Sequence, residues 1–349
     1  MKWDLSMQDF IEKLIEYAAK APSGHNTQPW KFAYYKNIVK IFPDYSRSLP
    51  VVDEDNHALF ISLGCAVENL IVAAGHFGYL AKVDYFPSYE NNECIRVKLE
   101  EGTIDPDNRL FEAIDKRQST RSQYNGRNIP AEDVSALLST LHYEGVKSLI
   151  FNKKQEIIPL IEFVRQGSSK QFSNKTFKNE LLSWVRFNAK AAEATCDGLR
   201  SATMGSPAVP SWLGKLIITL LTPSGEAKRA EKLIKSAAAL MIFIAEADDK
   251  RNWINLGRTF ERVALTATAL GIKHSHLNMP CEEVEIRNKL ARYLGLSNKQ
   301  QPLLLIRLGY ADFMPYSFRR PLNRIIYKEK SLDNPELKEP LKASTSDDS

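Results

Sequence analysis

The sequence predicts an α+β fold that is duplicated in one chain, with central sheets flanked by helices about a pseudo-two-fold axis. The main observation is an internal repeat at a constant offset of 193 residues. It relates residues 61–78 to residues 254–271 through six identities, which in the first copy are Ile61, Leu63, Gly64, Glu68, Ala74 and Gly78. Both segments read as long apolar helices that end at a glycine. Their internal glycines, Gly64 and Gly257, are expected to let a second helix or a ligand pack closely.

An earlier helix is repeated as well, at an offset of 124 residues. Asp9-Phe10 and Leu14 match Asp133-Val134 and Leu138. The first copy opens with a capping-box-like Ser6-x-x-Asp9 and continues with apolar residues at helical spacing. The two offsets differ by 69 residues, so the second half carries an insertion of about that length between its two repeated helices.

Four apolar runs predict strands of the two sheets. They are Lys31–Ile41, Cys94–Leu99, Ala238–Ala245 and Pro302–Leu308. The last two are almost continuously apolar, which is typical of strands covered on both faces.

These elements divide the chain into a first half at 1–105, a second half at 106–327 and a charged tail at 328–349 that is expected to be disordered. The inserted segment falls at about 163–237. It contains a turn-rich stretch, Met204–Gly214, and a short apolar run, Leu216–Leu221. A surface elaboration and a lid over a pocket between the halves are equally good interpretations of this segment.

The composition excludes several classes of protein. The chain has 349 residues, of which 44% are hydrophobic and 26% charged, with a net charge of +5, and no basic run is interleaved with aromatic residues. Nucleic acid is therefore not an expected partner. Four widely spaced cysteines and an N-terminus without an apolar stretch predict a cytoplasmic protein with free thiols. The apolar run Ala58–Ala74 is broken by polar residues, which favours a buried helix over a membrane span, and no membrane partner is expected.

The stretch Ala21–Trp30, with the sequence Ala-Pro-Ser-Gly-His-Asn-Thr-Gln-Pro-Trp, is the most informative segment of the chain. Its two prolines cannot continue a helix. Such a loop holds small polar groups in a fixed array beside one large flat apolar residue, Trp30. This arrangement suits a planar ligand with a polar edge, although an ordered structural loop has the same composition.

Two basic clusters could bind an anion. Arg117-Gln-Ser119-Thr-Arg121 places two guanidiniums and a hydroxyl at alternate positions, and Arg319-Arg320 follows the last apolar strand. Each pattern alone is also typical of a solvated basic loop. No dinucleotide-binding glycine motif, Walker A motif or G-x-S-x-G motif occurs, and His274-Ser-His276 lacks a carboxylate at ligand spacing, so no metal site is expected.

Together these motifs resemble the flavin-dependent nitroreductase family. Ala21–Trp30 is similar to its Pro-Ser-x-x-Asn-x-Gln-Pro-Trp motif, Arg117–Arg121 to its R-x-S-x-R motif, and the segment from Leu270 to Pro280 to its flavin-facing loop. In that family two subunits share each active site. Here the first half holds the Pro-Ser loop, while the second half holds R-x-S-x-R and has His142-Tyr-Glu-Gly where its own Pro-Ser loop would stand.

This division of motifs resembles the Acg-type tandem proteins of the family, in which two fused units surround one FMN under an inserted lid. The resemblance covers about Leu5 to Ile326. It implies that Arg117, Ser119 and Arg121 bind the FMN phosphate and ribityl chain, and that Arg319 or Arg320 adds a phosphate contact. It further implies contacts to the isoalloxazine ring from two groups of residues: Pro22, Ser23, Gly24 and Asn26 along the ring, and Leu277, Asn278 and Met279 near flavin N5.

The resemblance implies an oxidoreductase that passes electrons from NAD(P)H through FMN to a quinone, a nitroaromatic compound or a similar acceptor. No catalytic residue is evident, and His25 is the nearest titratable side chain. Two alternatives stay open: an FMN-binding protein with little turnover, and a structural protein that has lost the flavin. Because the two halves supply one complete site, the chain is expected to function as a monomer.

Overall fold

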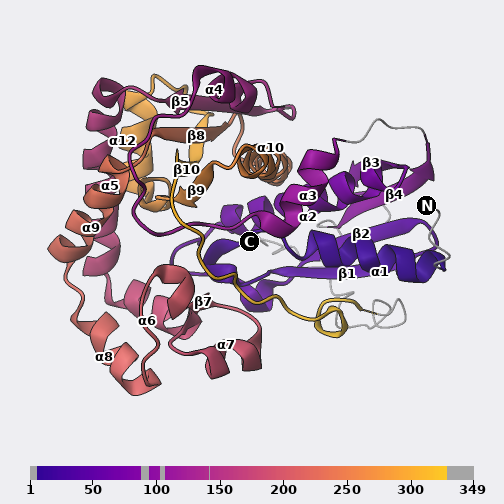
Figure 1. The fold of residues 1–349 in the computed structure, drawn as a ribbon, viewed down its shortest axis with the longest axis horizontal. Coiled ribbons are helices and arrows are strands. Elements are labelled where there is room, and N and C mark those ends of the chain that lie inside the picture. The colour runs from indigo at the N-terminus through magenta and orange to yellow at the C-terminus, as the bar shows by residue number, and fades with distance from the viewer. Residues whose placement is uncertain (1–5, 88–93, 103–106, 141, 328–349) are drawn as a thin grey trace, which may run out of the picture.

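The computed structural model describes residues 6–87, 94–102, 107–140 and 142–327. Two sheets lie on either side of a central pair of helices, and a group of further helices extends from the second sheet (Figure 1). The predicted disordered tail at 328–349 lies outside the described residues.

The first sheet belongs to the N-terminal half of the chain. Its strands are antiparallel and lie in the order β1-β2-β4-β3. The elements of this half are α1 (Met7–Ala18), β1 (Trp30–Tyr35), β2 (Ile38–Pro43), α2 (His57–His76), β3 (Tyr79–Tyr85) and β4 (Ile95–Glu101). Helix α1 begins as predicted, because the Ser6 side chain accepts a hydrogen bond from the Asp9 backbone N–H.

The second sheet has the equivalent order β5-β8-β10-β9 and is also antiparallel. The elements around it are α3 (Asn108–Lys116), α4 (Ala131–Leu138), β5 (Val146–Phe151), β8 (Ala239–Ala245), α10 (Lys250–Ala269), β9 (Lys273–His276), α11 (Met279–Glu282), α12 (Val284–Tyr293) and β10 (Gln301–Gly309). In both halves a helix leads into two strands, a 20-residue helix and two more strands. This shared order confirms the predicted duplication.

The repeated glycines mark the place where α2 and α10 cross. A Cβ atom on Gly64 would lie 2.1 Å from the backbone oxygen of Ile254, and one on Gly257 would lie 1.9 Å from that of Ile61. Each glycine therefore accepts the backbone of the other helix, as its place in the repeat predicts. The glycines that follow the two helices, Gly78 and Gly271, adopt φ values of 82° and 74°, the left-handed conformation common after a helix end.

The strand predictions are correct for the central strands of both sheets, but they merge or miss the edge strands. The run Lys31–Ile41 is a hairpin of two strands, β1 and β2, and not one strand. Its two-residue turn begins at Lys36, which has a φ of 50°. Strands β3, β5 and β9 were not predicted. β3 alternates between half-buried and exposed residues and offers no apolar run.

The second half carries its insertion between β5 and β8, where the first half has only the hairpin turn. The insertion contains α5 (Lys154–Ser173), α6 (Lys175–Trp184), β6 (Val185–Arg186), α7 (Ala189–Thr195), β7 (Leu199–Arg200), α8 (Ser211–Leu220) and α9 (Pro223–Lys235). It starts before residue 163, because α5 follows β5 almost directly. The predicted loop Met204–Gly214 ends inside α8, and the run that starts at Leu216 is helical.

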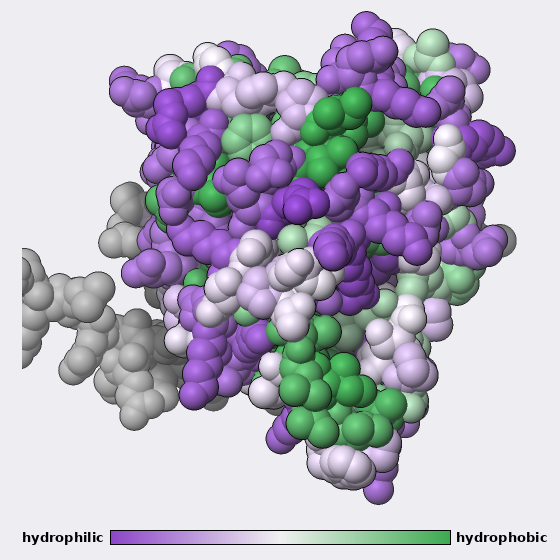
Figure 2. All heavy atoms as spheres, turned by 90° about the vertical axis from the view of Figure 1, so that its left-hand side faces the viewer, coloured by the Kyte–Doolittle hydropathy of each residue, from purple (hydrophilic) through white to green (hydrophobic). Residues whose placement is uncertain are grey.

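Helix α8 exposes one apolar face. Trp212 and Leu220 keep 70% and 67% of their surface exposed, and apolar side chains gather at the end of the molecule where α8 lies (Figure 2). Its other face packs into a small cluster with Val185 and Phe187, apart from the main core. By contrast, α2 is the one described helix that is long and apolar enough to cross a membrane, and it is buried between the two halves.

Candidate functional site

The loop Ala21–Trp30 has a strained backbone that hydrogen bonds hold in place. His25, Asn26 and Gln28 adopt φ values of 48°, 55° and 53°, in the left-handed region that residues other than glycine rarely occupy. The backbone N–H of Gln28 donates to Ser23 Oγ at 2.9 Å, and the buried Trp30 anchors the end of the loop at the start of β1. Strain of this kind is often found at functional sites.

The segment Arg117–Arg121 runs in extended form beside strand β9. Ser119 forms a bridge with His274, and the Thr120 backbone N–H donates to the His274 carbonyl at 2.9 Å. The side chain of Gln118 holds the C-terminal segment against it: Nε2 donates to the Met314 carbonyl at 2.9 Å, and Oε1 accepts from the Met314 N–H at 3.0 Å. Three parts of the chain that are distant in sequence thus meet here.

One pocket lies where these segments meet. Its lining residues come from the loop, the arginine segment, the insertion and the C-terminal segment: Pro22, Ser23, Asn26, Arg117, Gln118, Ser119, Arg121, Thr203, Pro315, Tyr316, Ser317 and Arg319. Of the residues predicted from sequence, the structure therefore brings together Pro22, Ser23 and Asn26 with Arg117, Ser119, Arg121 and Arg319. They come from both halves.

Two of the pocket's arginines are fixed by groups behind it. Arg117 donates from Nη2 to the Lys20 carbonyl at 3.0 Å, and its Nε lies 3.2 Å from Glu261 Oε1. Arg319 donates to Asn26 Oδ1 at 2.8 Å and to the same Lys20 carbonyl at 3.1 Å. The guanidiniums are therefore oriented by the protein itself.

The pocket carries an excess of positive charge. Burial lowers the pKa of Arg121 to about 10, with further lowering by Arg117 and Arg307. Burial and Arg117 lower the pKa of Arg319 to about 9, against the attraction of Glu261. Burial raises the pKa of Glu261 to about 7, although Arg117 and Arg319 favour its charged form. An anion in this pocket would compensate guanidiniums that are costly to bury without one.

Neutral histidines lie around this charge. Burial and the nearby Arg121 lower the pKa of His25 to about 4, and burial with Arg121 and Arg117 lowers that of His276 to about 4. Burial lowers the pKa of His274 well below its usual value, and neither of its ring nitrogens has a hydrogen-bond partner among the described residues. All three imidazoles are uncharged at neutral pH.

The insertion reaches the pocket and is tied to the loop. Asn26 Nδ2 donates to the Gly198 carbonyl at 3.2 Å, and Gln28 Nε2 donates to the Cys196 carbonyl at 2.8 Å. Between them, the buried Asp197 forms ion pairs with Arg47 and with Arg186, the latter at 2.7 Å. Residues 196–198 of the insertion therefore lie directly on the loop.

Several predicted site residues lie elsewhere. Leu277, Asn278 and Met279 do not line the pocket: Asn278 Oδ1 accepts from the Leu305 N–H at 2.9 Å and its Nδ2 donates to Glu282. Arg320 turns away and donates to the Gln28 and Arg324 carbonyls. Gly24 is not a lining residue either, and a Cβ atom on it would meet Leu49.

The structure adds residues that sequence reasoning did not assign to the site. They are Gln118, Thr203, Tyr316 and, behind Arg117, Glu261. Glu261 carried a signal as one of the identities of the repeat, and Gln118 lies inside the Arg117–Arg121 segment. The pocket contacts of Thr203 and Tyr316 depend on how the insertion and the C-terminal segment fold back.

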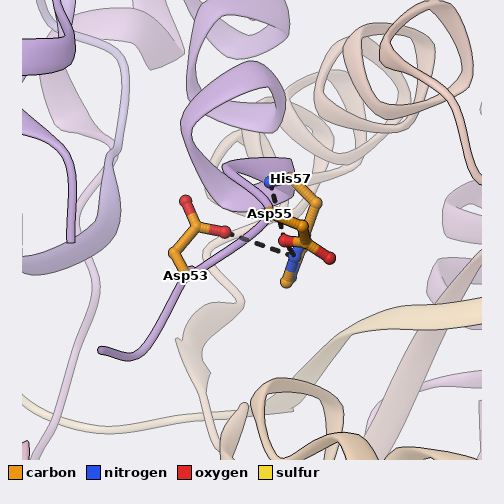
Figure 3. Close-up of side chains that lie close together, drawn as sticks. All are labelled: Asp53, Asp55 and His57. Atoms are coloured by element: carbon orange, nitrogen blue, oxygen red, sulfur yellow. Dashed lines mark hydrogen bonds and ion pairs between the residues drawn. The ribbon is translucent and has the colours of Figure 1, made fainter. Parts of the chain in front are cut away.

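A second polar cluster lies at the start of α2. The carboxylates of Asp53 and Asp55 approach the ring of His57, with Asp53 Oδ1 3.2 Å from His57 Nδ1 (Figure 3). Asp53 also accepts the backbone N–H groups of Ala58 and Leu59 at 2.8 and 2.9 Å. Burial disfavours the charged imidazole, but Asp55 and Asp53 outweigh it and raise the pKa of His57. These contacts account for the cluster as an ion pair at a helix N-terminus.

Comparison with known proteins identifies relatives. A family model described as "Nitroreductase family" matches residues 114–310. The "Putative NAD(P)H nitroreductase Rv3131" of Mycobacterium tuberculosis is 24% identical over 326 residues, which cover 90% of each chain. The "Putative NAD(P)H nitroreductase acg" of the same organism is 31% identical over 80 residues, 23% of this chain and 24% of that protein.

Solved structures give weaker similarities. A nitroreductase with bound FMN from Bacteroides fragilis has a TM-score of 0.36 at 18% identity, covering 62% of this chain and 96% of that one. The NADPH:FMN oxidoreductase from Vibrio harveyi complexed with NAD+ has a TM-score of 0.36 at 13% identity, covering 66% and 85%.

Proposed function

The chain belongs to the nitroreductase family, and from this premise we propose that it is an FMN-dependent oxidoreductase that passes electrons from NAD(P)H to an electrophilic acceptor such as a quinone or a nitroaromatic compound. The observation that carries the proposal is the convergence of the Pro22–Asn26 loop, the Arg117–Arg121 segment and Arg319 on one pocket. The lining of this pocket comes from both halves of the chain.

The donor set of the pocket fits the phosphate and ribityl chain of FMN. Arg117, Arg121 and Arg319 line the pocket, and Glu261 pairs with Arg117 behind it, so a dianion would restore the charge balance. Arg319 Nε is buried and has no hydrogen-bond partner among the described residues. A planar guanidinium can donate two parallel hydrogen bonds to phosphate oxygens, and the Ser119 hydroxyl can bind a sugar alcohol.

The remaining residues fit the flat end of FMN less completely. Pro22 and Ser23 line the pocket where the ring would lie. The side-chain amide of Asn26 already forms hydrogen bonds with Gly198, Phe318 and Arg319. When bound, FMN supplies hydride chemistry between donor and acceptor. The protein's part is to bind the phosphate, to orient the ring against the loop and to exclude water with the insertion and the C-terminal segment.

Two kinds of support favour a nicotinamide donor. A relative that aligns over 90% of both chains is described as a "Putative NAD(P)H nitroreductase". The pocket itself has no charged acid group among its lining residues, so the nicotinamide and the acceptor would meet a neutral or basic surface.

A second function, binding of FMN with little turnover, is favoured by the insertion. Its residues 196–198 are held on the loop by Asn26, Gln28 and Arg47, and Thr203 lines the pocket. A cover held by that many contacts would slow the entry of both nicotinamide and acceptor.

Visible spectroscopy of the purified chain tests the proposal. Flavin absorbance that bleaches within seconds of anaerobic NADPH addition is the result expected of an oxidoreductase. Absorbance that persists would support binding without turnover. A colourless protein that takes up no added FMN would overturn both functions.

A further inference from the structure

Six buried polar atoms without a hydrogen-bond partner belong to four residues around the Arg117–Glu261 pair, and they carry an inference that rests on the proposed function. They are Arg117 Nε, both carboxylate oxygens of Glu261, both ring nitrogens of His274 and Arg319 Nε. We propose that Glu261 is the positioning residue for Arg117, and that it takes up one proton from solvent when the anionic cofactor binds.

Glu261 lies where it fixes the plane of the Arg117 guanidinium. It projects from α10, has no exposed surface, and approaches Arg117 Nε at 3.2 Å. The Lys20 carbonyl accepts from Arg117 Nη2 at 3.0 Å on another edge of the same group. The ion pair at Nε, which lacks hydrogen-bond geometry, and the hydrogen bond at Nη2 together hold the guanidinium against two fixed groups.

The repeat supplies an internal comparison. Glu68 occupies the position equivalent to Glu261, and it accepts from Arg258 Nε at 3.2 Å, Arg262 Nε at 2.6 Å and Tyr143 Oη at 2.8 Å. The equivalents of Arg258 and Arg262 beside Glu261 are Cys65 and Asn69.

Glu68 is therefore saturated by permanent donors. Glu261 has one guanidinium, which is shared with the pocket, and the nearby Asn69 amide does not complete its hydrogen bonding.

Each charged or titratable neighbour of Glu261 has a fixed charge near neutral pH. Arg117 from the segment after α3 is ion-paired with Glu261, Arg319 from the C-terminal segment has a pKa of about 9 and stays positive, and Glu68 on α2 is paired. Burial and Glu261 raise the pKa of the Cys65 thiol, so it stays protonated, and His274 on β9 stays neutral. Glu261, with a pKa of about 7, is the group in this set that changes charge.

Binding of a dianion shifts the protonation equilibrium of Glu261 toward the protonated form. In the free protein the guanidiniums favour the carboxylate. A bound phosphate compensates those guanidiniums and adds like charge, which favours the protonated form. The complex therefore holds more protons than the free protein, and affinity for FMN falls as pH rises above about 7. The proton passes from solvent to a Glu261 oxygen, and no bond to the cofactor is made or broken.

Calorimetric titration with FMN at pH 8, in two buffers of different ionisation enthalpy, measures this proton directly. A phosphate monoester has its second pKa at about 6, so FMN is already dianionic at pH 8 and contributes little. Because a group with a pKa of about 7 is only about one-tenth protonated at pH 8, we expect the wild-type chain to take up at most about 0.9 proton per FMN. Glu261→Gln should bind FMN without that uptake, and Glu261→Asp, which keeps the carboxylate, should restore it.

The mirror variant Glu68→Gln is the matched control, and it should keep the uptake because its carboxylate lies away from the pocket. FMN binding without proton uptake in the wild-type chain, or equal uptake in the Glu261→Gln variant, would overturn the inference alone. Failure of the wild-type chain to bind FMN would overturn the proposed function and this inference with it. The wild-type measurement stands even where a glutamine variant does not fold.

Discussion

Some side chains at this site both line the pocket and hold its parts together, and Asn26 is the clearest example. From sequence it is expected to meet the edge of a flavin. In the structure its amide joins the insertion through Gly198, the C-terminal segment through Phe318 and the pocket through Arg319. Its left-handed backbone, with a φ of 55°, is sustained by these contacts. Asn26 therefore assembles the pocket, whatever contact it makes with a ligand.

The arginine pair gives the most direct prediction at the scale of single residues. The double variant Arg117→Ala, Arg121→Ala should lose FMN retention, because each guanidinium contributes roughly 1.5–3 kcal/mol to a charged partner and the losses act on one ligand. Affinity should fall at least 100-fold in a fluorescence titration.

Arg320→Ala is the control for the arginine pair. Its guanidinium binds the Gln28 and Arg324 carbonyls outside the pocket, so a small change in FMN affinity is expected. Unchanged flavin content in the double variant would mean that the site is misplaced.

The neutral histidines predict how stability depends on pH. His276 has a pKa of about 4 in the folded chain and about 6.5 when unfolded. The unfolded state therefore binds more protons below pH 6.5, and the folded state loses stability as pH falls from 6.5 to 4.

In urea denaturation of the ligand-free protein, His276→Asn should remove part of that loss, at most about 1.4 kcal/mol per pH unit. Parallel pH profiles of the variant and the wild-type chain between pH 6.5 and 4 would contradict a buried neutral imidazole at this position.

At the scale of elements, the buried elements were predicted best from the sequence. The repeat located α2 and α10 and the glycines at their crossing, because burial and close approach leave a pattern in residue type. Edge strands such as β3 leave none, since one of their faces meets solvent. The loop Leu277–Met279 follows β9, and the Asn278 side chain supports β10 by accepting from the Leu305 N–H, while a backbone contact from this loop to a flavin stays a prediction.

The helix crossing predicts a severe effect from one methyl group. Gly257→Ala places a Cβ 1.9 Å from the Ile61 carbonyl oxygen, and both atoms belong to rigid helices. The two helices must separate, so we expect a loss of more than about 3 kcal/mol in the free energy of unfolding, or no folded protein.

Gly225→Ala in α9 is the matched control for the crossing. There the added atom meets only the Thr222 hydroxyl, at 2.9 Å, and the change should be within about 1 kcal/mol of neutral. Thermal unfolding of the two variants separates close packing from helix propensity; equal effects would contradict the crossing.

The contacts that hold residues 196–198 of the insertion on the loop predict an effect on the rate of FMN dissociation. Burial would raise the pKa of Asp197, but hydrogen bonds from Thr195, Arg47 and Arg186 outweigh it and lower the pKa. Asp197→Asn removes the charge that these arginines share, which should loosen residues 196–198. We expect FMN to dissociate about tenfold faster in stopped-flow exchange, corresponding to about 1.4 kcal/mol.

Glu193→Gln removes an exposed charge four residues earlier in the chain and should leave the dissociation rate unchanged. If Asp197→Asn dissociates FMN at the wild-type rate, the insertion does not limit release.

At the scale of the whole molecule, the site is divided between the halves, and this division sets what sequence can predict. The repeat and the unequal motifs indicated one composite site. They could not place Glu261 against Arg117, since the contact depends on how α10 crosses beneath the segment after α3. The approach of Thr203 depends likewise on the path of the insertion.

The duplication also determines how many sites the molecule can hold. The position related to the pocket by the repeat is occupied by side chains: Arg258 stacks on Tyr143 at 3.7 Å and, with Arg262, neutralises Glu68. In that cluster both guanidiniums are already hydrogen-bonded to the Glu68 carboxylate, whereas at the pocket one guanidinium, that of Arg117, forms an ion pair with Glu261. The Glu68 side of the duplicated frame is therefore packed with hydrogen-bonded side chains, and the proposed binding site lies on the Arg117 side.

This asymmetry predicts one FMN per chain. Titration of the purified protein, followed by flavin absorbance and by calorimetry, should saturate at a molar ratio of 1, because the equivalent position is filled and its ion pairs would have to break to admit a ligand. The Arg117→Ala, Arg121→Ala variant should bring the ratio to 0 without leaving a weaker second site. A ratio of 2 in the wild-type chain, or residual stoichiometric binding in that variant, would show that the Glu68 side also opens to ligand and that the two halves are still functionally equivalent.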